Sequence, residues 1–314
     1  MTTKSGQRGL IRAGELLPEV LPASLFDEVI RPEDVGYTHP VFLQCFMPLR
    51  HRPDNKDDWQ TDCGRASLVI TAGKLVDPNK PNTFVKMTVP AGPKARILNA
   101  YINDYILRER TKTIPLGETM RDAMERMNIP ICGSNGKELE KELKNFAAAE
   151  IILGVWDQDG SAHQLQTKLA RRLSFWIERN ANQKVFWQPD LDVSDEYYNA
   201  ITEPDRMAPY YWPALVGLQH NPRAMDIHCF LVYRLRNGLK RPVVLHAKVL
   251  HAMFGGNRGL LKHFWPEFKK ALAEAHKFYP NAIIEVKNDC IILKDSPPLI
   301  PYRKMPRLSR ITEA

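Results

Sequence analysis

One order of helices and strands occurs twice along this chain: helix, strand, helix, helix and then two strands. In the first copy, hydrophobic periodicity and turn residues predict elements at residues 93–110, 113–116, 118–127, 137–150, 151–156 and 184–187. In the second copy, the same signals predict elements at residues 222–236, 242–245, 247–254, 260–278, 283–286 and 291–293. This is the order of a winged helix, a helix-turn-helix variant that ends in a β-hairpin. The sequence therefore predicts an α+β chain with two tandem winged-helix domains.

The segments outside the two copies are organised differently. Residues 1–35 contain prolines that keep any helix short, which predicts a partly ordered N-terminal arm. Extra strands are expected at 41–47 and 66–71, with a polar loop at 51–62 between them, and their edges could pair with another copy of the chain. Prolines and acidic residues interrupt the periodicity at 190–213, between the copies. The expected division is an N-terminal arm, a first winged-helix domain that includes the extra strands, and a second winged-helix domain with a C-terminal tail: residues 1–35, 36–190 and 191–314.

The charge of the chain is basic and is concentrated in its last third. The sequence carries 44 Lys and Arg against 36 Asp and Glu, a net charge of +8, with a pI near 9.2. Residues 206–314 alone carry 18 basic and 7 acidic residues, net +11, whereas residues 85–190 carry net +3 and residues 1–84 net −1. Such an asymmetry indicates a polyanionic partner. We therefore expect double-stranded DNA as the partner and the second domain as the main DNA-binding unit.

Neither a membrane nor an oxidising compartment is indicated. No apolar run approaches the roughly 20 residues that a membrane-spanning helix needs, and the N-terminus lacks the apolar core of a secretory signal. The five cysteines are scattered and form no Cys-x-x-Cys pair, which argues against a disulfide framework and against a zinc ribbon. We expect a cytoplasmic protein with no membrane partner.

The helix expected at 260–278 carries the sharpest signal for DNA contact. At about 100° per residue, its apolar residues from Leu261 to Tyr279 fall on one arc and its cationic residues on the opposite arc. The loop before it presents Asn257 and Arg258, the side-chain types that pair with adenine and guanine in the major groove. A lysine face that is only solvated remains the alternative interpretation. The expected DNA contacts are the cationic and amide side chains of this loop, this helix and the hairpin after it: Asn257, Arg258, Lys262, His263, Lys269, Lys270, Lys277, Lys287, Asn288 and Lys294.

The corresponding helix of the first copy, expected at 137–150, is balanced in charge. Its lysines alternate with Glu138, Glu140 and Glu142, and pairs at i,i+3 and i,i+4 neutralise its face. This helix alone would bind phosphate weakly, so two roles stay open: additional contacts to the DNA backbone, or mainly protein contacts. The expected DNA contacts of the first domain are three lysines of this helix and two arginines further along the chain: Lys137, Lys141, Lys144, Arg171 and Arg172.

No set of residues in the sequence indicates a catalytic or metal site. DNA-nicking initiators hold a metal ion with a His-x-His pair, which is absent, so the pair Tyr197–Tyr198 is expected to consist of packing aromatics. The segment Gly133–Lys137 lacks the spacing of a phosphate-binding P-loop. His246, His251 and His263 lack the i,i+4 spacing of a zinc motif on a helix. We expect no enzymatic activity, no catalytic residue, no metal and no cofactor.

Several blocks of the sequence resemble the RepA family of plasmid replication initiators. They occur in the family's order and together span about residues 36–300. His228 and Cys229 depart from the aromatic and apolar residues that the family favours at those places. The blocks that carry the resemblance are residues 89–96, 113–117, 139–146, 222–236 and 250–255, and the spacing of Phe264, Phe268 and Leu272 that leads to Tyr279 and Pro280.

The resemblance implies a bacterial cytoplasmic protein that binds repeated sequences, called iterons, at a plasmid origin. It further implies duplex opening, contacts with the host initiator and helicase, and control of plasmid copy number. Related initiators are homodimers off DNA and monomers on iterons, and their C-terminal winged helix supplies the main reading of the major groove. A winged-helix transcriptional repressor is the alternative, because composition does not separate the two roles.

Overall fold

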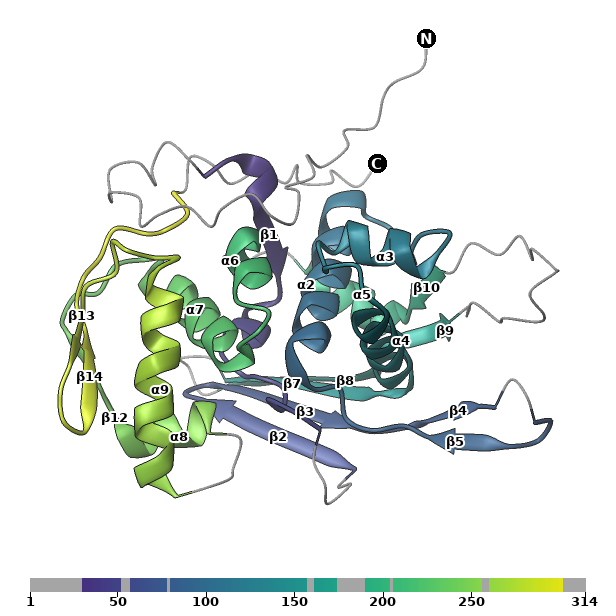
Figure 1. The fold of residues 1–314 in the computed structure, drawn as a ribbon, viewed down its shortest axis with the longest axis horizontal. Coiled ribbons are helices and arrows are strands. Elements are labelled where there is room, and N and C mark those ends of the chain that lie inside the picture. The colour runs from purple at the N-terminus through teal and green to yellow at the C-terminus, as the bar shows by residue number, and fades with distance from the viewer. Residues whose placement is uncertain are drawn as a thin grey trace, which may run out of the picture.

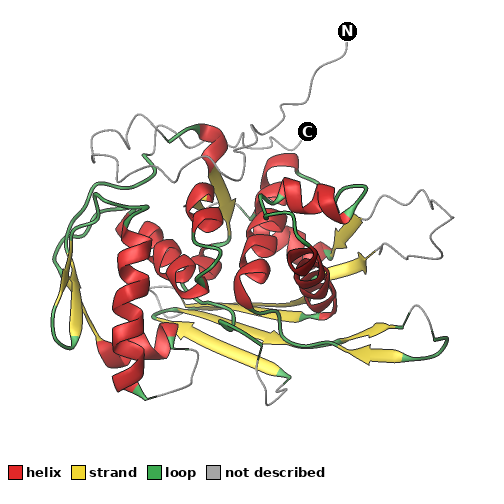
Figure 2. Cartoon of the chain, in the orientation of Figure 1, coloured by secondary structure: helices red, strands yellow, loops and turns green. Residues whose placement is uncertain are grey.

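The structure is a computed structural model that describes residues 30–51, 57–77, 80–156, 161–173, 190–203, 206–255 and 260–301 (Figure 1). Helices and antiparallel strands alternate along the chain, and a group of helices lies over one four-stranded sheet (Figure 2). The predicted α+β class is confirmed. Among the described residues, no helix combines the length and the apolar character that crossing a membrane requires.

The second copy of the repeat lies at one end of the molecule, and each predicted element is present within a few residues of its expected bounds (Figure 1). Its three strands form an antiparallel sheet in the order β12-β14-β13. The first helix begins where it does because the side chain of Asn221 accepts a hydrogen bond from the N–H of Ala224 and Pro222 occupies the first helical position. The elements, in chain order, are α7 (Pro222–Leu235), β12 (Val243–His246), α8 (Ala247–Phe254), α9 (Leu261–His276), β13 (Ile284–Val286) and β14 (Cys290–Leu293).

The first copy has the predicted order of elements but pairs its strands differently. The hairpin partner of β7 is β8 (Ala162–Lys168), whereas the strand expected at 184–187 lies outside the described residues. Strand β6 pairs with β10 (Asp190–Val193), which also pairs with β9 (Ala170–Leu173). The other edge of β7 pairs with an N-terminal strand, so the hairpin of the first copy belongs to a larger sheet that does not include β6. The predicted elements are present as α2 (Gly92–Glu109), β6 (Thr113–Pro115), α3 (Met120–Arg126), α4 (Gly133–Ala148) and β7 (Glu150–Trp156), of which α4 begins before its expected start at 137.

The strands before the first copy belong to the four-stranded sheet, whose order is β2-β3-β7-β8. Strand β3 (Ala66–Thr71) has the predicted bounds, but the loop expected at 51–62 is wrong in its second part, which forms β2 (Asp58–Cys63). Trp59 and Thr61 face the core while their neighbours are exposed, which is the alternation of a half-buried strand. Because β3 lies between β2 and β7, its edges are not available to another copy of the chain.

The strand predicted at 41–47 is also wrong. Residues Pro40–Leu43 form the short 3-10 helix η2. Pro40 fixes a helical φ at the first position, and Nδ1 of His39 accepts a hydrogen bond from the N–H of Val41 at 3.3 Å. The apolar side chains that follow are buried against α7 and β3, so a tight helical turn satisfies the hydrophobic pattern that indicated a strand.

The segment at 190–213 was expected to interrupt the structure between the copies, but its described residues, 190–203 and 206–213, include strands and helices. Strand β1 (Val35–Thr38), near the start of the described chain, pairs with β11 (Ala208–Tyr211), and α5 (Asp195–Thr202) packs against α2. The contacts of this segment therefore cross the expected boundary at residue 190, and the division into domains stays a prediction. Residues 1–29 of the expected arm lie outside the described residues. The elements concerned, together with a protruding hairpin of the first half, are η1 (Pro32–Asp34), β1 (Val35–Thr38), β4 (Lys74–Val76), β5 (Phe84–Lys86), α5 (Asp195–Thr202), β11 (Ala208–Tyr211) and α6 (Trp212–Gly217).

A buried ion pair joins the first helices of the two copies. The guanidinium of Arg96 on α2 donates to both carboxylate oxygens of Asp226 on α7, each at 2.6 Å. The other N–H groups of Arg96 donate hydrogen bonds to the carbonyls of Met47, Pro48 and Gly92. Since both side chains are almost fully buried, removing one partner would leave an uncompensated charge, at a typical cost of about 3–5 kcal/mol. The pair therefore couples the two copies to each other.

Candidate nucleic-acid interface

Helix α9 is held on the second copy by its aromatic face. Phe264, Phe268 and Leu272 are buried, and the ring of Phe268 lies 5.7 Å from that of Phe254 on α8. Trp265 stacks on Phe268 at 5.7 Å. The predicted apolar arc is thus the docked face, and the opposite face of α9 is exposed to solvent.

The exposed face of α9 is cationic. Lys262, His263, Lys269, Lys270 and Lys277 are all exposed, as the sequence predicts. Within the described part of the chain, neither Lys262 nor Lys270 has an ion-pair partner. The structure therefore presents positive charge along α9 that is free to meet phosphate.

The acidic residues of α9 are engaged by α7 instead of by these lysines. Glu267 forms an ion pair of 2.9 Å with Arg223, and Glu274 accepts a hydrogen bond of 3.0 Å from the side chain of Asn221. His220 also lies 3.2 Å from Glu274. These contacts position α9 against α7, and they leave the lysine face without its own counter-charges.

The three hairpin residues predicted to contact DNA differ in how available their side chains are. Lys287 and Asn288 are exposed in the β13–β14 turn, where both stay accessible. Lys294 forms an ion pair with Glu285, which neutralises part of its charge. The two residues expected to read bases, Asn257 and Arg258, lie outside the described residues.

In the first copy, more of the side chains predicted to contact DNA are paired with acidic residues. On α4, Lys137 and Lys141 are exposed, whereas Lys144 pairs with Glu140 four residues earlier, as predicted. On β9, Arg171 is exposed, but Arg172 pairs with two acids of β10, Asp190 and Asp192, at 3.4 and 2.8 Å. The structure therefore brings more unpaired cationic side chains together on α9 than on α4.

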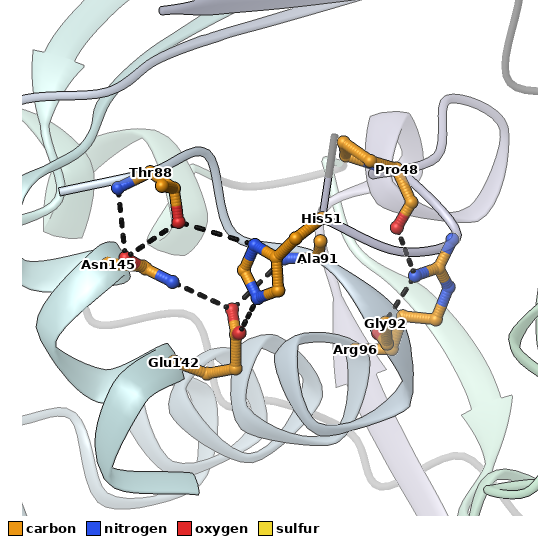
Figure 3. A network of polar contacts seen from close by, with 8 residues as sticks. All are labelled: Pro48, His51, Thr88, Ala91, Gly92, Arg96, Glu142 and Asn145. Atoms are coloured by element: carbon orange, nitrogen blue, oxygen red, sulfur yellow. Dashed lines mark hydrogen bonds and ion pairs between the residues drawn. The ribbon is translucent and has the colours of Figure 1, made fainter. Parts of the chain in front are cut away.

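Glu142 does not belong to the solvent face of α4, which corrects the sequence interpretation. Its carboxylate is buried and accepts hydrogen bonds from the N–H of Ala91 at 3.0 Å and from His51, whose Nε2 lies 2.6 Å away (Figure 3). Asn145 accepts from the N–H of Thr88 at 3.1 Å in the same network. The signal was present, because position 142 lies on the helical arc of the buried residues 139, 143 and 146. The network fixes α4 against the start of α2.

One family model and two solved structures are similar to this chain. Residues 94–242 match the family model described as "Plasmid encoded RepA protein", from the first turn of α2 to the residue before β12. Two solved structures align with the chain, both of domains 2 and 3 of RctB. The first has a TM-score of 0.49 and 9% sequence identity, and the alignment covers 82% of this chain and 98% of that chain. The second has a TM-score of 0.49 and 10% sequence identity, and the alignment covers 81% of this chain and 95% of that chain. No curated protein matches. The resemblance to the RepA family is confirmed over the matched residues.

Proposed function

We propose, from the premise that residues 94–242 form a region of the plasmid-encoded RepA family, that this protein is a replication initiator that binds iterons at a plasmid origin. The family match is the observation that carries the proposal. The cationic face of α9 and the hairpin turn support the DNA-binding part of it, because both are exposed on one helix-turn-helix unit.

Affinity and sequence preference come from different residues in this proposal. Lys262, Lys269 and Lys270 neutralise phosphates and supply affinity for any duplex. Arg258 and Asn257, at the entry to α9, supply base contacts in the major groove. Phosphate contacts fix the register of the protein on DNA, and base contacts select the sequence.

The two copies act on DNA as one coupled body. The Arg96–Asp226 pair joins them through a buried contact, and β1, before the first copy, pairs with β11, which lies between the copies. The second copy binds the main site, while Lys137 and Lys141 of the first copy add weaker contacts at a fixed distance. A fixed distance suits repeated sites of constant length.

Origin opening, contacts with the host initiator and helicase, copy-number control and a bacterial cytoplasmic location complete the proposal. We place no catalytic step in this protein and no enzymatic role. The free protein is a homodimer and binds each iteron as a monomer. Sedimentation of the full chain with and without iteron DNA tests this, and a free protein that stays monomeric at micromolar concentration would refute it.

The DNA that flanks the gene separates the two candidate functions. An initiator requires direct repeats of about two helical turns beside an A·T-rich stretch, and the full chain should protect those repeats in a footprint. A transcriptional repressor requires a palindrome over a promoter, since two-fold symmetric dimers bind such sites. Protection of a lone palindrome, with no binding to direct repeats, would favour the repressor over the initiator.

A further inference from the structure

Three metal-ligating side chains meet where the hairpin of the second copy joins α8. His246 is the last residue of β12, Asp289 lies in the β13–β14 turn, and Cys290 is the first residue of β14. Their ligand atoms all lie within 4.8 Å of one another. We propose that these residues form a binding site for a divalent transition-metal ion, and that Zn²⁺ is the ion that fits them best.

The sheet register brings these residues together, although they are distant in sequence. His246 and Cys290 are directly opposite each other in the β12–β14 ladder, so their side chains lie on the same face of the sheet. Asp289 precedes Cys290, and its carbonyl accepts a hydrogen bond of 2.7 Å from the N–H of Ala247. The backbone of the site is therefore fixed by strand pairing and by the start of α8.

The side chains need only small movements to surround an ion. In a tetrahedral zinc site with bonds of about 2.0–2.3 Å, ligand atoms lie roughly 3.3–3.6 Å apart. The separations here exceed that by at most about 1.5 Å. The side chains of His246 and Asp289 are 62% and 78% exposed, so their rotation towards the buried Cys290 disturbs no packing.

The ligand chemistry selects the ion. An imidazole, a carboxylate and a thiolate are the nitrogen, oxygen and sulfur ligands of Zn²⁺, whereas Mg²⁺ and Ca²⁺ prefer oxygen alone. Binding releases the thiol proton of Cys290 to solvent, so affinity should rise with pH. The fourth position is filled by water. Without an ion, His246 and Asp289 at 3.8 Å form only an exposed pair of small energetic value.

The site would stiffen the turn that carries two of the predicted DNA contacts. Lys287 and Asn288 are exposed in the turn that Asp289 ends, and the N–H of Lys287 donates to the carbonyl of Cys290 at 2.8 Å. A bound ion would connect this turn to β12 and α8. The proposal does not depend on DNA binding, because metal affinity is measured on the protein alone.

Cobalt binding to the full chain tests the site. Co²⁺ replaces Zn²⁺ in such sites and reports a thiolate ligand by an intense sulfur-to-metal absorption band. One equivalent of Co²⁺ should produce this band in protein kept reduced without thiols, and Zn²⁺ should remove it. Cys290→Ser should abolish the band, and His246→Ala, an exposed change that leaves the core intact, should weaken affinity at least about 100-fold.

Two substitutions serve as matched controls. Cys132→Ser removes an exposed thiol on the first copy, and His263→Ala removes an exposed imidazole on α9. Both should leave the cobalt band and the affinity unchanged. The proposal is overturned if saturating Co²⁺ gives no sulfur-to-metal band, if the band survives in Cys290→Ser, or if Cys132→Ser removes it.

Discussion

At the scale of single residues, the core carries ionisable groups whose charged forms it disfavours. His228 is fully buried on α7 between the rings of Tyr211 and Phe278, and burial lowers its pKa to about 4. Burial, aided by Arg206, lowers the pKa of His39 to about 4 as well. Both histidines stay neutral in the folded chain at a pH where the unfolded chain binds protons on them.

The sign of the resulting pH dependence follows from these lowered values. The unfolded histidine has a pKa near 6.5, so the unfolding free energy should be full above about pH 6.5 and fall as the pH decreases towards 4. Each histidine contributes at most about 3 kcal/mol to this loss. His228→Phe keeps an aromatic ring of similar size and should remove roughly half of the loss in urea titrations between pH 7 and 4.5. An unchanged pH dependence in this variant would mean that His228 already titrates normally in the folded state.

At the scale of elements, helices of the repeat were predictable from sequence because each has an apolar arc. Their starts were less predictable, since α4 begins at Gly133, before its expected start at 137, and has no side-chain cap. α8 has the predicted bounds, and α9 buries the predicted face. The signals failed where tertiary contacts decide the structure. Pro40–Leu43 became helical because its apolar side chains fill a space between the copies, and Glu142 became buried because it bonds the start of α2. No local pattern encodes the pairing of β1 with β11.

The separate roles of phosphate contacts and base contacts at α9 can be tested by substitution. Lys270→Ala should weaken binding to all duplexes about equally and reduce the slope of log K against log salt by about one. Arg258→Ala should weaken the binding free energy by on the order of 1–3 kcal/mol and relax the sequence preference at one base position. Lys74→Ala, on the β4–β5 hairpin at the opposite end of the molecule (Figure 1), is the matched control and should change neither quantity. If Arg258→Ala leaves the base preference intact, base reading is performed by other residues.

At the scale of the whole molecule, the two copies share one continuous core, which the sequence did not predict. The residues at 190–213 were expected to interrupt the periodicity between the copies, whereas their described part forms strands and helices that pack on both sides. Arg96 and Asp226 lie within separate sequence blocks, and neither block by itself indicates that the two side chains meet. Their contact depends on the complete fold.

This coupling predicts a specific loss of stability. Asp226→Asn leaves the buried Arg96 without its counter-charge and should lower the unfolding free energy by about 3–5 kcal/mol at pH 7. Glu125→Gln, in the exposed pair with Arg121, is the control and should cost less than about 1 kcal/mol. Urea denaturation of the full chain measures both. Equal losses in the two variants would show that the buried Arg96–Asp226 pair contributes no more to stability than an exposed pair does.

In the proposed function, the second copy supplies most of the affinity for origin DNA. The direct measurement is the salt dependence of full-chain binding to the plasmid's own direct repeats, for two charge-removal variants. Lys262, Lys269 and Lys270 changed together to Ala should reduce the salt slope by about three and remove most of the binding. Lys137 and Lys141 changed together to Ala should have a smaller effect on both. Loss of binding in the first-copy variant, with binding retained in the α9 variant, would contradict the assignment of the main DNA-binding surface to the second copy.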